Sequence, residues 1–150
     1  MTSIERLADY RLFPSAPSPQ AYCELRQVAG LSSKTMTQAT AAIAGSWAAC
    51  HVMAYPANVP VAMGRVIGDG GWYFHIADMA THPDHQRRGL GSAVMEWLLK
   101  SILDAVDEEP YVTLMADPPG RVLYERFGFQ ETAPDSVGMR LTASRSRARR

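Results

Sequence analysis

The chain has 150 residues, 47% of them hydrophobic, which suffices for one well-packed domain and is too little for two ordinary ones. Lysine plus arginine and aspartate plus glutamate each total 15, so no net field favours nucleic acid or an anionic membrane as a partner. The two cysteines, Cys23 and Cys50, have no metal-ligand spacing. Their apolar surroundings favour buried free thiols in a reducing compartment over a disulfide framework.

The two ends of the sequence favour a cytoplasmic protein. The first residues lack a basic start followed by an apolar core, so no signal peptide is expected. No apolar run approaches the roughly 18 residues of a membrane span. Residues 143–150 contain four arginines and no apolar residue beyond alanine. We therefore predict a single domain over residues 1–142 and a basic, disordered tail over residues 143–150.

Hydrophobic patterns and turn residues predict alternating strands and helices in the first half of the chain. Ser18 suits an N-cap with Pro19 in the first helical turn, and Gly30 ends that helix. The segment Pro56–Pro60 separates two β-rich apolar runs, as the loop of an antiparallel hairpin does. The expected elements are a strand at Leu7–Phe13, the helix after Ser18, a weaker helix at Ser33–Ala44, and strands at Trp47–Tyr55 and Val61–Ile67.

The second half is built around one long amphipathic helix. That helix, expected from Gly91 to about Ala105, places Val94, Leu98 and Ile102 on one face and must pack on a sheet. The fold class is therefore α+β, with a mixed, mainly antiparallel sheet and helices on both faces. The other elements expected here are strands at Trp72–Thr81, Tyr111–Ala116, Phe129–Thr132 and Val137–Thr142, and a helix from Asp117 to Phe127.

The loop Gln86–Gly91 joins the strand that ends at Thr81 to the long helix. Its glycines allow a positive φ and a close backbone approach, and the amides at a helix start bind phosphate. Arg87 and Arg88 add charge that pairs with phosphate, although a solvated turn also accounts for them. The loop has neither the Gly-x-Gly-x-x-Gly of dinucleotide sites nor the Gly-Lys-Ser/Thr of the Walker loop. We predict a phosphate site at this junction.

Two segments make the chain similar to the GNAT superfamily of N-acetyltransferases, which use acetyl-coenzyme A. Met79–Gly91 resembles the family's acetyl-CoA motif, and Leu123–Phe129 resembles its second signature. The resemblance covers roughly residues 7 to 142. It implies the GNAT fold, a mostly antiparallel central sheet of about six or seven strands flanked by about four helices. It also implies a bulge in the strand before the loop and a splay from the next strand.

The same resemblance implies where acetyl-CoA binds. The amide of Met79 would face the thioester carbonyl, and that of Thr81 the pantetheine, while the amides of Arg87–Ser92 would hold the pyrophosphate. Donors fixed near a carbonyl stabilise the oxyanion that forms when an amine attacks. The residues implied in coenzyme binding are Met79, Ala80, Thr81, Gln86, Arg87, Arg88, Gly89, Leu90, Gly91, Ser92, Asp117 and Tyr124.

Three residues are candidates for proton transfer. Tyr124 matches the family tyrosine that protonates the departing thiolate, and a core aromatic is its ordinary alternative. His75 stands four residues before Met79, where several relatives place a base, and the strand's period of two puts residues 75, 77 and 79 on one face. Asp78 is the rival base, although it lies on the opposite face unless a bulge re-aims it. The remaining alternative is that no side chain serves as the base.

Two further patterns limit the site. Asp117 stands where relatives usually carry asparagine, and Gly120 where they commonly carry alanine; a carboxylate accepts hydrogen bonds but cannot donate them. His82 and His85 flank a proline in a turn and have no nearby third ligand, so no metal is expected.

The acceptor site is expected between the first two helices, at Leu31–Gln38, and near Ala133–Met139. No acidic cluster marks a groove for histone tails or polyamines. The candidate acceptor-binding residues are Tyr22, Leu31, Trp72, Phe74 and Val137, although aromatic residues in strands more often belong to the core.

The resemblance thus implies an enzyme that transfers acetyl from acetyl-CoA to a primary amine of a small molecule. Transfer would be direct, because Cys23 and Cys50 match no nucleophile position. One alternative is a protein or peptide acceptor, at a lysine or an N-terminus. Another is a non-catalytic acyl-CoA-binding module that kept the fold. Dimers are common in the family, so the resemblance also allows a homodimer.

Overall fold

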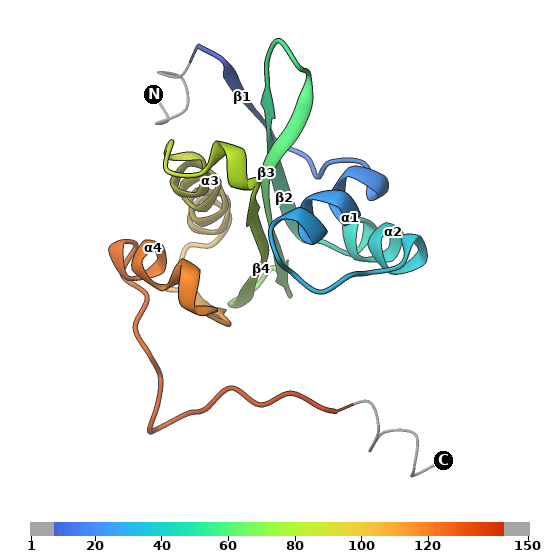
Figure 1. The fold of residues 1–150 in the computed structure, drawn as a ribbon. Coiled ribbons are helices and arrows are strands. Elements are labelled where there is room, and N and C mark those ends of the chain that lie inside the picture. The colour runs from blue at the N-terminus through green and yellow to red at the C-terminus, as the bar shows by residue number, and fades with distance from the viewer. Residues whose placement is uncertain (1–7, 143–150) are drawn as a thin grey trace. The chain divides into compact units, whose positions relative to one another are not determined.

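The computed structural model describes residues 8–142. The chain divides into two compact units, with the boundary between Leu114 and Met115 (Figure 1). The expectations for Leu7 and for the tail at residues 143–150 lie outside the described residues. The single domain expected over residues 1–142 stays a prediction.

The first unit is built on a five-stranded sheet in the order β1-β2-β3-β4-β5. Neighbouring strands from β1 to β4 are antiparallel, which confirms the predicted hairpin around Pro56–Pro60 and the mainly antiparallel sheet, whereas β5 runs parallel to β4. Five strands are fewer than the six or seven expected, because the two last segments are not strands. The strands are β1 (Tyr10–Phe13), β2 (Ala48–Ala54), β3 (Val59–Gly68), β4 (Tyr73–Thr81) and β5 (Tyr111–Leu114).

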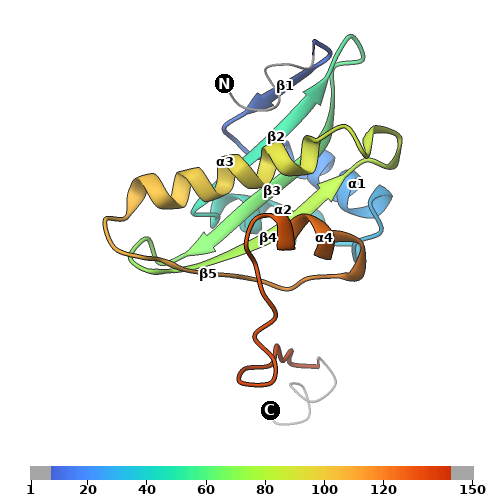
Figure 2. The ribbon, with the colours of Figure 1, turned by 90° about the vertical axis from the view of Figure 1, so that its left-hand side faces the viewer.

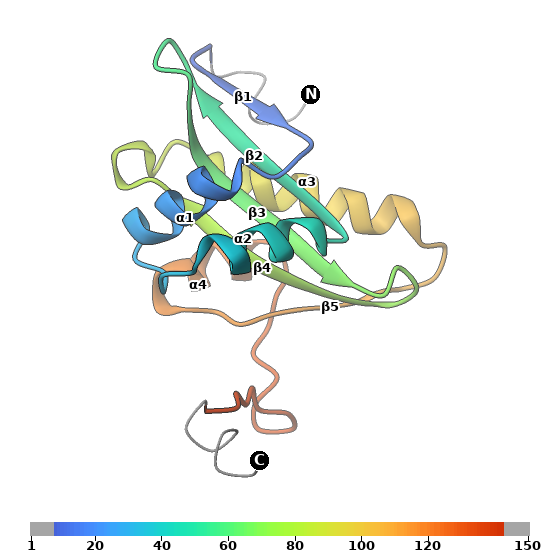
Figure 3. The same cartoon turned by 90° about the vertical axis from the view of Figure 1, so that its right-hand side faces the viewer.

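Helices cover both faces of this sheet. The long helix α3 (Leu90–Ala105) packs on β2, β3 and β4 from one side (Figure 2). The helices α1 (Pro19–Val28) and α2 (Met36–Ala44) lie on the other side, where α1 contacts β3 and β4 (Figure 3). The apolar stripe predicted for α3 is buried, which removes apolar surface from water. The predicted α+β class is therefore confirmed, and no described helix is long and apolar enough to cross a membrane.

Local capping explains where the first two helices begin. The hydroxyl of Ser18 accepts a hydrogen bond from the amide of Ala21, and Pro19 occupies the first turn, as predicted. Thr35 and Gln38 cap α2 reciprocally through a side-chain-to-amide pair of bonds. This capping box places the start of α2 at Met36, three residues after the predicted start.

The second unit differs most from the sequence prediction. It contains a 3-10 turn, Pro118–Gly120, followed by α4 (Arg121–Arg126), in place of one continuous helix. The segments 129–132 and 137–142, expected to be strands, are irregular. A strand needs a neighbour for its backbone groups, and no described segment pairs with either one. Three alternating apolar side chains, Val137, Met139 and Leu141, consequently stay 65%, 92% and 80% exposed.

Candidate active site

A β-bulge interrupts β4 at its centre. Met63 of β3 faces Ala80 and Arg65 faces Ala77, so Gly64 alone opposes both Asp78 and Met79. Asp78 has a φ of 56°, a left-handed conformation that residues with a side chain rarely adopt. A Cβ on Gly64 would lie 2.7 Å from the Sδ of Met79, so only glycine leaves room for that side chain. No pattern in the sequence indicates that Gly64 opposes this bulge, because the opposition depends on strand register.

The bulge changes which side chains share a face. His75 and Ala77 pair with Ile67 and Arg65 and lie on the face that α1 and α2 cover. Asp78 is turned onto this same face, where its carboxylate meets Arg65. Met79 instead points towards α3, beside Gly64. The prediction that residues 75, 77 and 79 share one face is therefore wrong for Met79, because the extra residue shifts the period of two.

Beyond the bulge, one edge of β4 has no strand partner among the described residues. Pairing between β4 and β5 ends at Ile76 and Leu114. On the other edge, the amide of His82 donates to the carbonyl of Val61 at 2.7 Å. Because successive amides of a strand point to opposite edges, those of Thr81 and Met79 point to the unpaired edge. The amide of Ala80 points towards β3, and its side chain is buried.

The loop after β4 leads into an open helix start. Gly89, with a φ of 81°, is the N-cap of α3, and no side chain caps this helix. The amide of Ala93 donates to the carbonyl of Gly89 at 3.0 Å, so the amides of Leu90, Gly91 and Ser92 precede the first intrahelical donor. Gly91 lies within the helix, so of the two loop glycines only Gly89 needs a positive φ.

The loop side chains have unequal roles. Arg88 donates to the hydroxyl of Tyr10 at 2.8 Å, and this hydroxyl also contacts His85, so Arg88 ties the loop to β1. Gln86 donates back to the carbonyl of Thr81 at 3.4 Å. Arg87 has a φ of 61° and an exposed side chain. Of the two arginines, Arg87 is therefore the better placed to meet an anion.

His75 is half-buried on β4 and is held by β5. Its Nδ1 lies 2.8 Å from the hydroxyl of Thr113, which donates its own proton to the carbonyl of Phe74 at 3.5 Å. We assign the ring proton to Nδ1, with this hydroxyl as its acceptor, which leaves Nε2 as the unprotonated nitrogen. Burial and the positive charge of Arg65 lower the pKa of His75 below its usual value, so the ring is neutral at pH 7.

Asp78 is the centre of a buried ion-pair cluster with Tyr22, Arg26 and Arg65. Tyr22 donates its hydroxyl proton to the carboxylate at 2.5 Å, Arg65 donates through Nε at 2.5 Å, and Arg26 donates through Nη1. Burial alone would raise the pKa of Asp78, but the hydrogen bonds from Tyr22 and Arg65 and the two positive charges outweigh it and lower the pKa. A carboxylate with these partners is a poor proton acceptor at neutral pH.

Tyr124 lies on α4 in the second unit. Burial and the negative charge of Asp117 raise the pKa of Tyr124, which keeps its hydroxyl protonated at neutral pH. Its ring packs edge-on against Phe129, with 6.3 Å between ring centroids. A Cβ at Gly120 would lie 2.7 Å from the Tyr124 ring, which accounts for glycine where relatives commonly carry alanine.

Comparisons with known proteins agree with this geometry. Residues 46–131, more than half of the chain, match the family model of the acetyltransferase (GNAT) domain. The chain belongs to the GNAT family. A crystal structure of a Staphylococcus aureus protein of unknown function, described as a probable acetyltransferase, has a TM-score of 0.82 at 38% identity. That similarity covers 89% of this chain and 98% of the other.

Two other relatives of this GNAT chain give weaker evidence about its function. A GNAT-family protein from Xanthomonas campestris has a TM-score of 0.72, covering 89% of this chain and 93% of the other, but at 20% identity it shows the fold alone. The uncharacterized N-acetyltransferase ycf52 of Porphyra purpurea is 38% identical over 77 residues. That match spans 51% of this chain and only 42% of the length of the relative.

The predicted acceptor-binding residues of the GNAT chain differ in their exposure. Tyr22 is buried, and Leu31 packs against the same apolar cluster. Phe74 is also fully buried, with its ring against Trp47, so neither Tyr22 nor Phe74 forms an open wall. Trp72 is 59% exposed, beside Tyr73 and Tyr111. Val137 lies exposed in the second unit.

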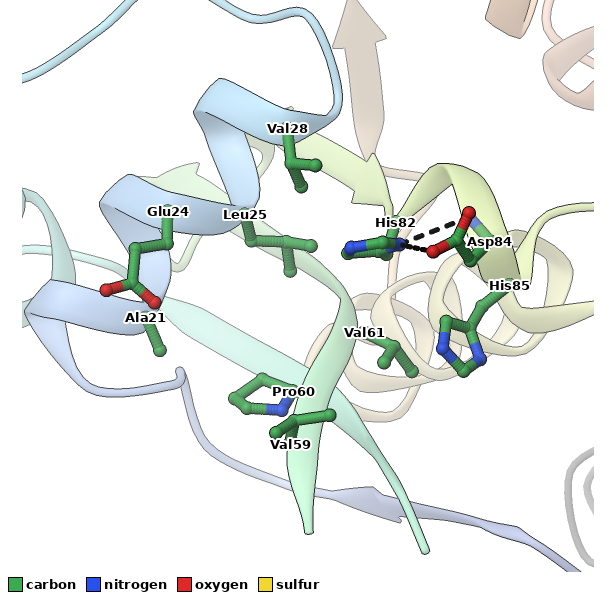
Figure 4. Close-up of a pocket in the computed structure, with 10 residues that line it drawn as sticks. All are labelled: Ala21, Glu24, Leu25, Val28, Val59, Pro60, Val61, His82, Asp84 and His85. Atoms are coloured by element: carbon green, nitrogen blue, oxygen red, sulfur yellow. Dashed lines mark hydrogen bonds and ion pairs between the residues drawn. The ribbon is translucent and has the colours of Figure 1, made fainter. Parts of the chain in front are cut away.

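A separate pocket of about 400 Å³ lies between α1, the start of β3 and the turn Pro83–His85 (Figure 4). None of the predicted site residues lines it. Nδ1 of His82 accepts a hydrogen bond from the amide of Asp84 at 3.1 Å. Over residues 8–142, no three histidine, cysteine or acidic side chains converge as a metal site would require. The lining residues are Ala21, Glu24, Leu25, Val28, Val59, Pro60, Val61, His82, Asp84 and His85.

Replacing Asp78 with alanine is expected to destabilise the protein strongly. The change leaves two nearly buried guanidinium groups without their carboxylate, which typically lowers the free energy of unfolding by about 3–5 kcal/mol. Because the pKa of Asp78 is lowered in the folded state, its contribution is present above the ordinary carboxyl pKa and is lost as the pH falls through the folded value. Urea denaturation at neutral and acidic pH measures both effects.

The matched control for this prediction is Asp104→Ala. Asp104 pairs with Lys100 on the surface of α3, and both side chains are more than 60% exposed. Loss of such a pair changes the free energy of unfolding by about 0.5 kcal/mol or less. An equally small change for Asp78→Ala would contradict the anchoring role.

Proposed function

We propose that this GNAT chain transfers acetyl from acetyl-CoA directly to a primary amine of a small molecule. The observation that carries the proposal is the unpaired edge of β4, which leads into the uncapped start of α3. The amides of Met79 and Thr81 along this edge suit an acyl-pantetheine arm, which offers carbonyl oxygens as acceptors. The amides of Leu90, Gly91 and Ser92 suit a pyrophosphate.

Bound acetyl-CoA supplies the acetyl group as a thioester, which is activated towards an amine. At the thioester, the protein contributes electrostatic stabilisation of the transition state. The Met79 amide stabilises the negative charge that develops on the carbonyl oxygen, and the strand holds this donor in place before reaction. At the other end, Arg87 and the first amides of α3 bind the phosphates.

His75 removes the proton that the acceptor amine must lose. An amine reaches the protein largely as an ammonium ion, and it attacks only after deprotonation. The Nε2 atom of His75 is the free acceptor in this assignment, because Nδ1–H is bonded to Thr113. The lowered pKa keeps the ring neutral and able to accept a proton at pH 7.

Tyr124 gives a proton to the departing thiolate. A phenol with a raised pKa holds its proton at neutral pH, while a thiol has an ordinary pKa of about 8.5. Because the phenol is the weaker acid, this transfer is uphill, and the tyrosinate regains its proton from solvent once the thiol has formed. This role rests on the family resemblance of Leu123–Phe129 and on the protonated state of the hydroxyl.

Two exposed aromatic side chains near His75 favour a small molecule as the acceptor. Tyr73 and Tyr111 face each other across β4 and β5, two residues before His75 and Thr113 in the same strands. Side chains two residues apart in a strand share a face, so these rings lie beside the proposed base. Both rings are more than 40% exposed and offer a surface against which the body of a small amine can pack.

Release of free CoA from acetyl-CoA over a panel of primary amines tests the proposal. The panel contains small amines, a lysine peptide and a peptide with a free N-terminus. At least one small amine should be acetylated. Its kcat/KM should fall in acid as His75 is protonated, at a pH below the ordinary pKa of histidine, because the pKa of His75 is lowered. The His75→Gln variant should lose about 100-fold in kcat/KM together with this acidic limb, because the base is gone.

The control for the pH profile is His51→Gln, because His51 lies on β2 and stacks on Phe13. Its profile should match that of the unmodified protein. An acidic limb that persists in His75→Gln would contradict the role of His75. Acetylation of the peptides alone would overturn the acceptor class, and no release with any amine would overturn acetyl transfer.

Tyr124→Phe should lower kcat by about 100-fold and leave the KM for acetyl-CoA nearly unchanged, because it removes a proton donor and keeps the ring. Steady-state kinetics at saturating amine measures both constants. Tyr55→Phe, on the loop between β2 and β3, is the matched control and should change neither. Unchanged turnover in Tyr124→Phe would rule out the acid role.

A further inference from the structure

Arg65 and His75 lie on the same face of the sheet. Arg65 faces Ala77 across β3 and β4, and His75 faces Ile67, so the two residues are diagonal neighbours. Diagonal neighbours of paired strands lie roughly 7–8 Å apart. The guanidinium of Arg65 also contributes to the lowered pKa of His75. A small molecule that reaches the imidazole therefore comes within the field of this cation.

One end of the Arg65 guanidinium is unused. Its Nε donates to Asp78, and its Nη1 lies 3.4 Å from both the carbonyl of Ala42 and the hydroxyl of Ser46. Among residues 8–142, Nη2 has no hydrogen-bond partner. No fully buried side-chain nitrogen or oxygen in this range lacks a partner, so Nη2 is not fully buried. The side chain as a whole is 15% exposed.

The cluster around Asp78 carries a surplus positive charge. It contains two guanidinium groups, Arg26 and Arg65, and one carboxylate. Arg26 is fully engaged, because Nε and Nη2 donate to Ser32 while Nη1 donates to Asp78. Among residues 8–142, no second acidic side chain contributes to the pKa of Asp78 or of His75. The surplus is therefore accessible at Nη2 of Arg65.

We propose that Arg65 determines acceptor specificity by binding an anionic group of the acceptor through Nη2. The acceptors are small primary amines that carry a carboxylate or a phosphate a few bonds from the amine. The amine faces Nε2 of His75 while the anionic group pairs with the guanidinium, whose planar N–H groups suit both anions. A second positive charge on the acceptor weakens binding at this site, because it is repelled by the guanidinium of Arg65. This inference rests on the proposed acetyl transfer.

Two matched pairs of amines test the proposal. β-Alanine is compared with its neutral amide, and phosphoethanolamine with ethanolamine, by free CoA release. A hydrogen-bonded ion pair should raise kcat/KM of the anionic member roughly 10- to 100-fold. Arg65→Gln should reduce the ratio to about one, and Arg65→Lys should keep part of it. A preference in only one pair identifies the anion as carboxylate or as phosphate.

Arg11→Gln is the control, because Arg11 lies on β1 over Phe13 and outside the cluster. It should keep the full ratio. Thermal unfolding and the Kd of acetyl-CoA show whether an Arg65 variant has kept its fold and coenzyme site. Equal kcat/KM within both pairs, or an unchanged ratio in folded Arg65→Gln, would overturn the proposal.

A binding measurement separates this inference from the proposed function. N-acetyl-β-alanine is titrated while the imidazole signals of His75 are followed by NMR, with N-methylacetamide as the neutral probe. The anionic probe should shift these signals in the unmodified protein and not in Arg65→Gln. If no amine is acetylated, this shift still supports the anion site; equal shifts from both probes would overturn it.

Discussion

The carboxylate of Asp78 fixes the geometry on which the rest of the site depends. A left-handed backbone at a residue with a side chain costs about 1–2 kcal/mol. Two guanidinium groups and a tyrosine hydroxyl bind the carboxylate and offset this cost. Because Arg26 belongs to α1 and Arg65 to β3, the bulge is held from two elements at once. Its position in β4 then decides which amides point to the unpaired edge.

The bulge separates two kinds of chemistry on one strand. On the face with α1 and α2, it brings His75 together with the charged cluster, where the proposed function places proton transfer and the selection of acceptor charge. Along the unpaired edge, the proposed contacts of Met79 and Thr81 with the coenzyme are made by backbone amides, so their side chains need only fit. Met79 fits because Gly64 leaves space on the neighbouring strand. Gly89 is likewise required for its backbone conformation: its φ is positive, while a Cβ there would contact no other atom.

Local signals predicted much of this arrangement from sequence. Ser18 and Pro19 predicted the start of α1, and the apolar spacing of Val94, Leu98 and Ile102 predicted the buried face of α3. Contacts between segments that are distant in the sequence could not be predicted. The pairing of Arg26 with Asp78 joins residues 52 positions apart, and the opposition of Gly64 to the bulge depends on register. The predicted face of Met79 was wrong because the bulge shifts the strand's period of two. The two last predicted strands were wrong because an alternating pattern does not show whether a partner strand is present.

Amide NMR during a titration with acetyl-CoA shows whether the unpaired edge of β4 and the start of α3 bind the coenzyme. The largest shifts are expected at the amides of Met79, Thr81 and Leu90–Ser92, with little change at Val52 in the sheet interior. Shifts confined to the pocket near Glu24 and His82, with Met79 and Thr81 unaffected, would contradict this expectation.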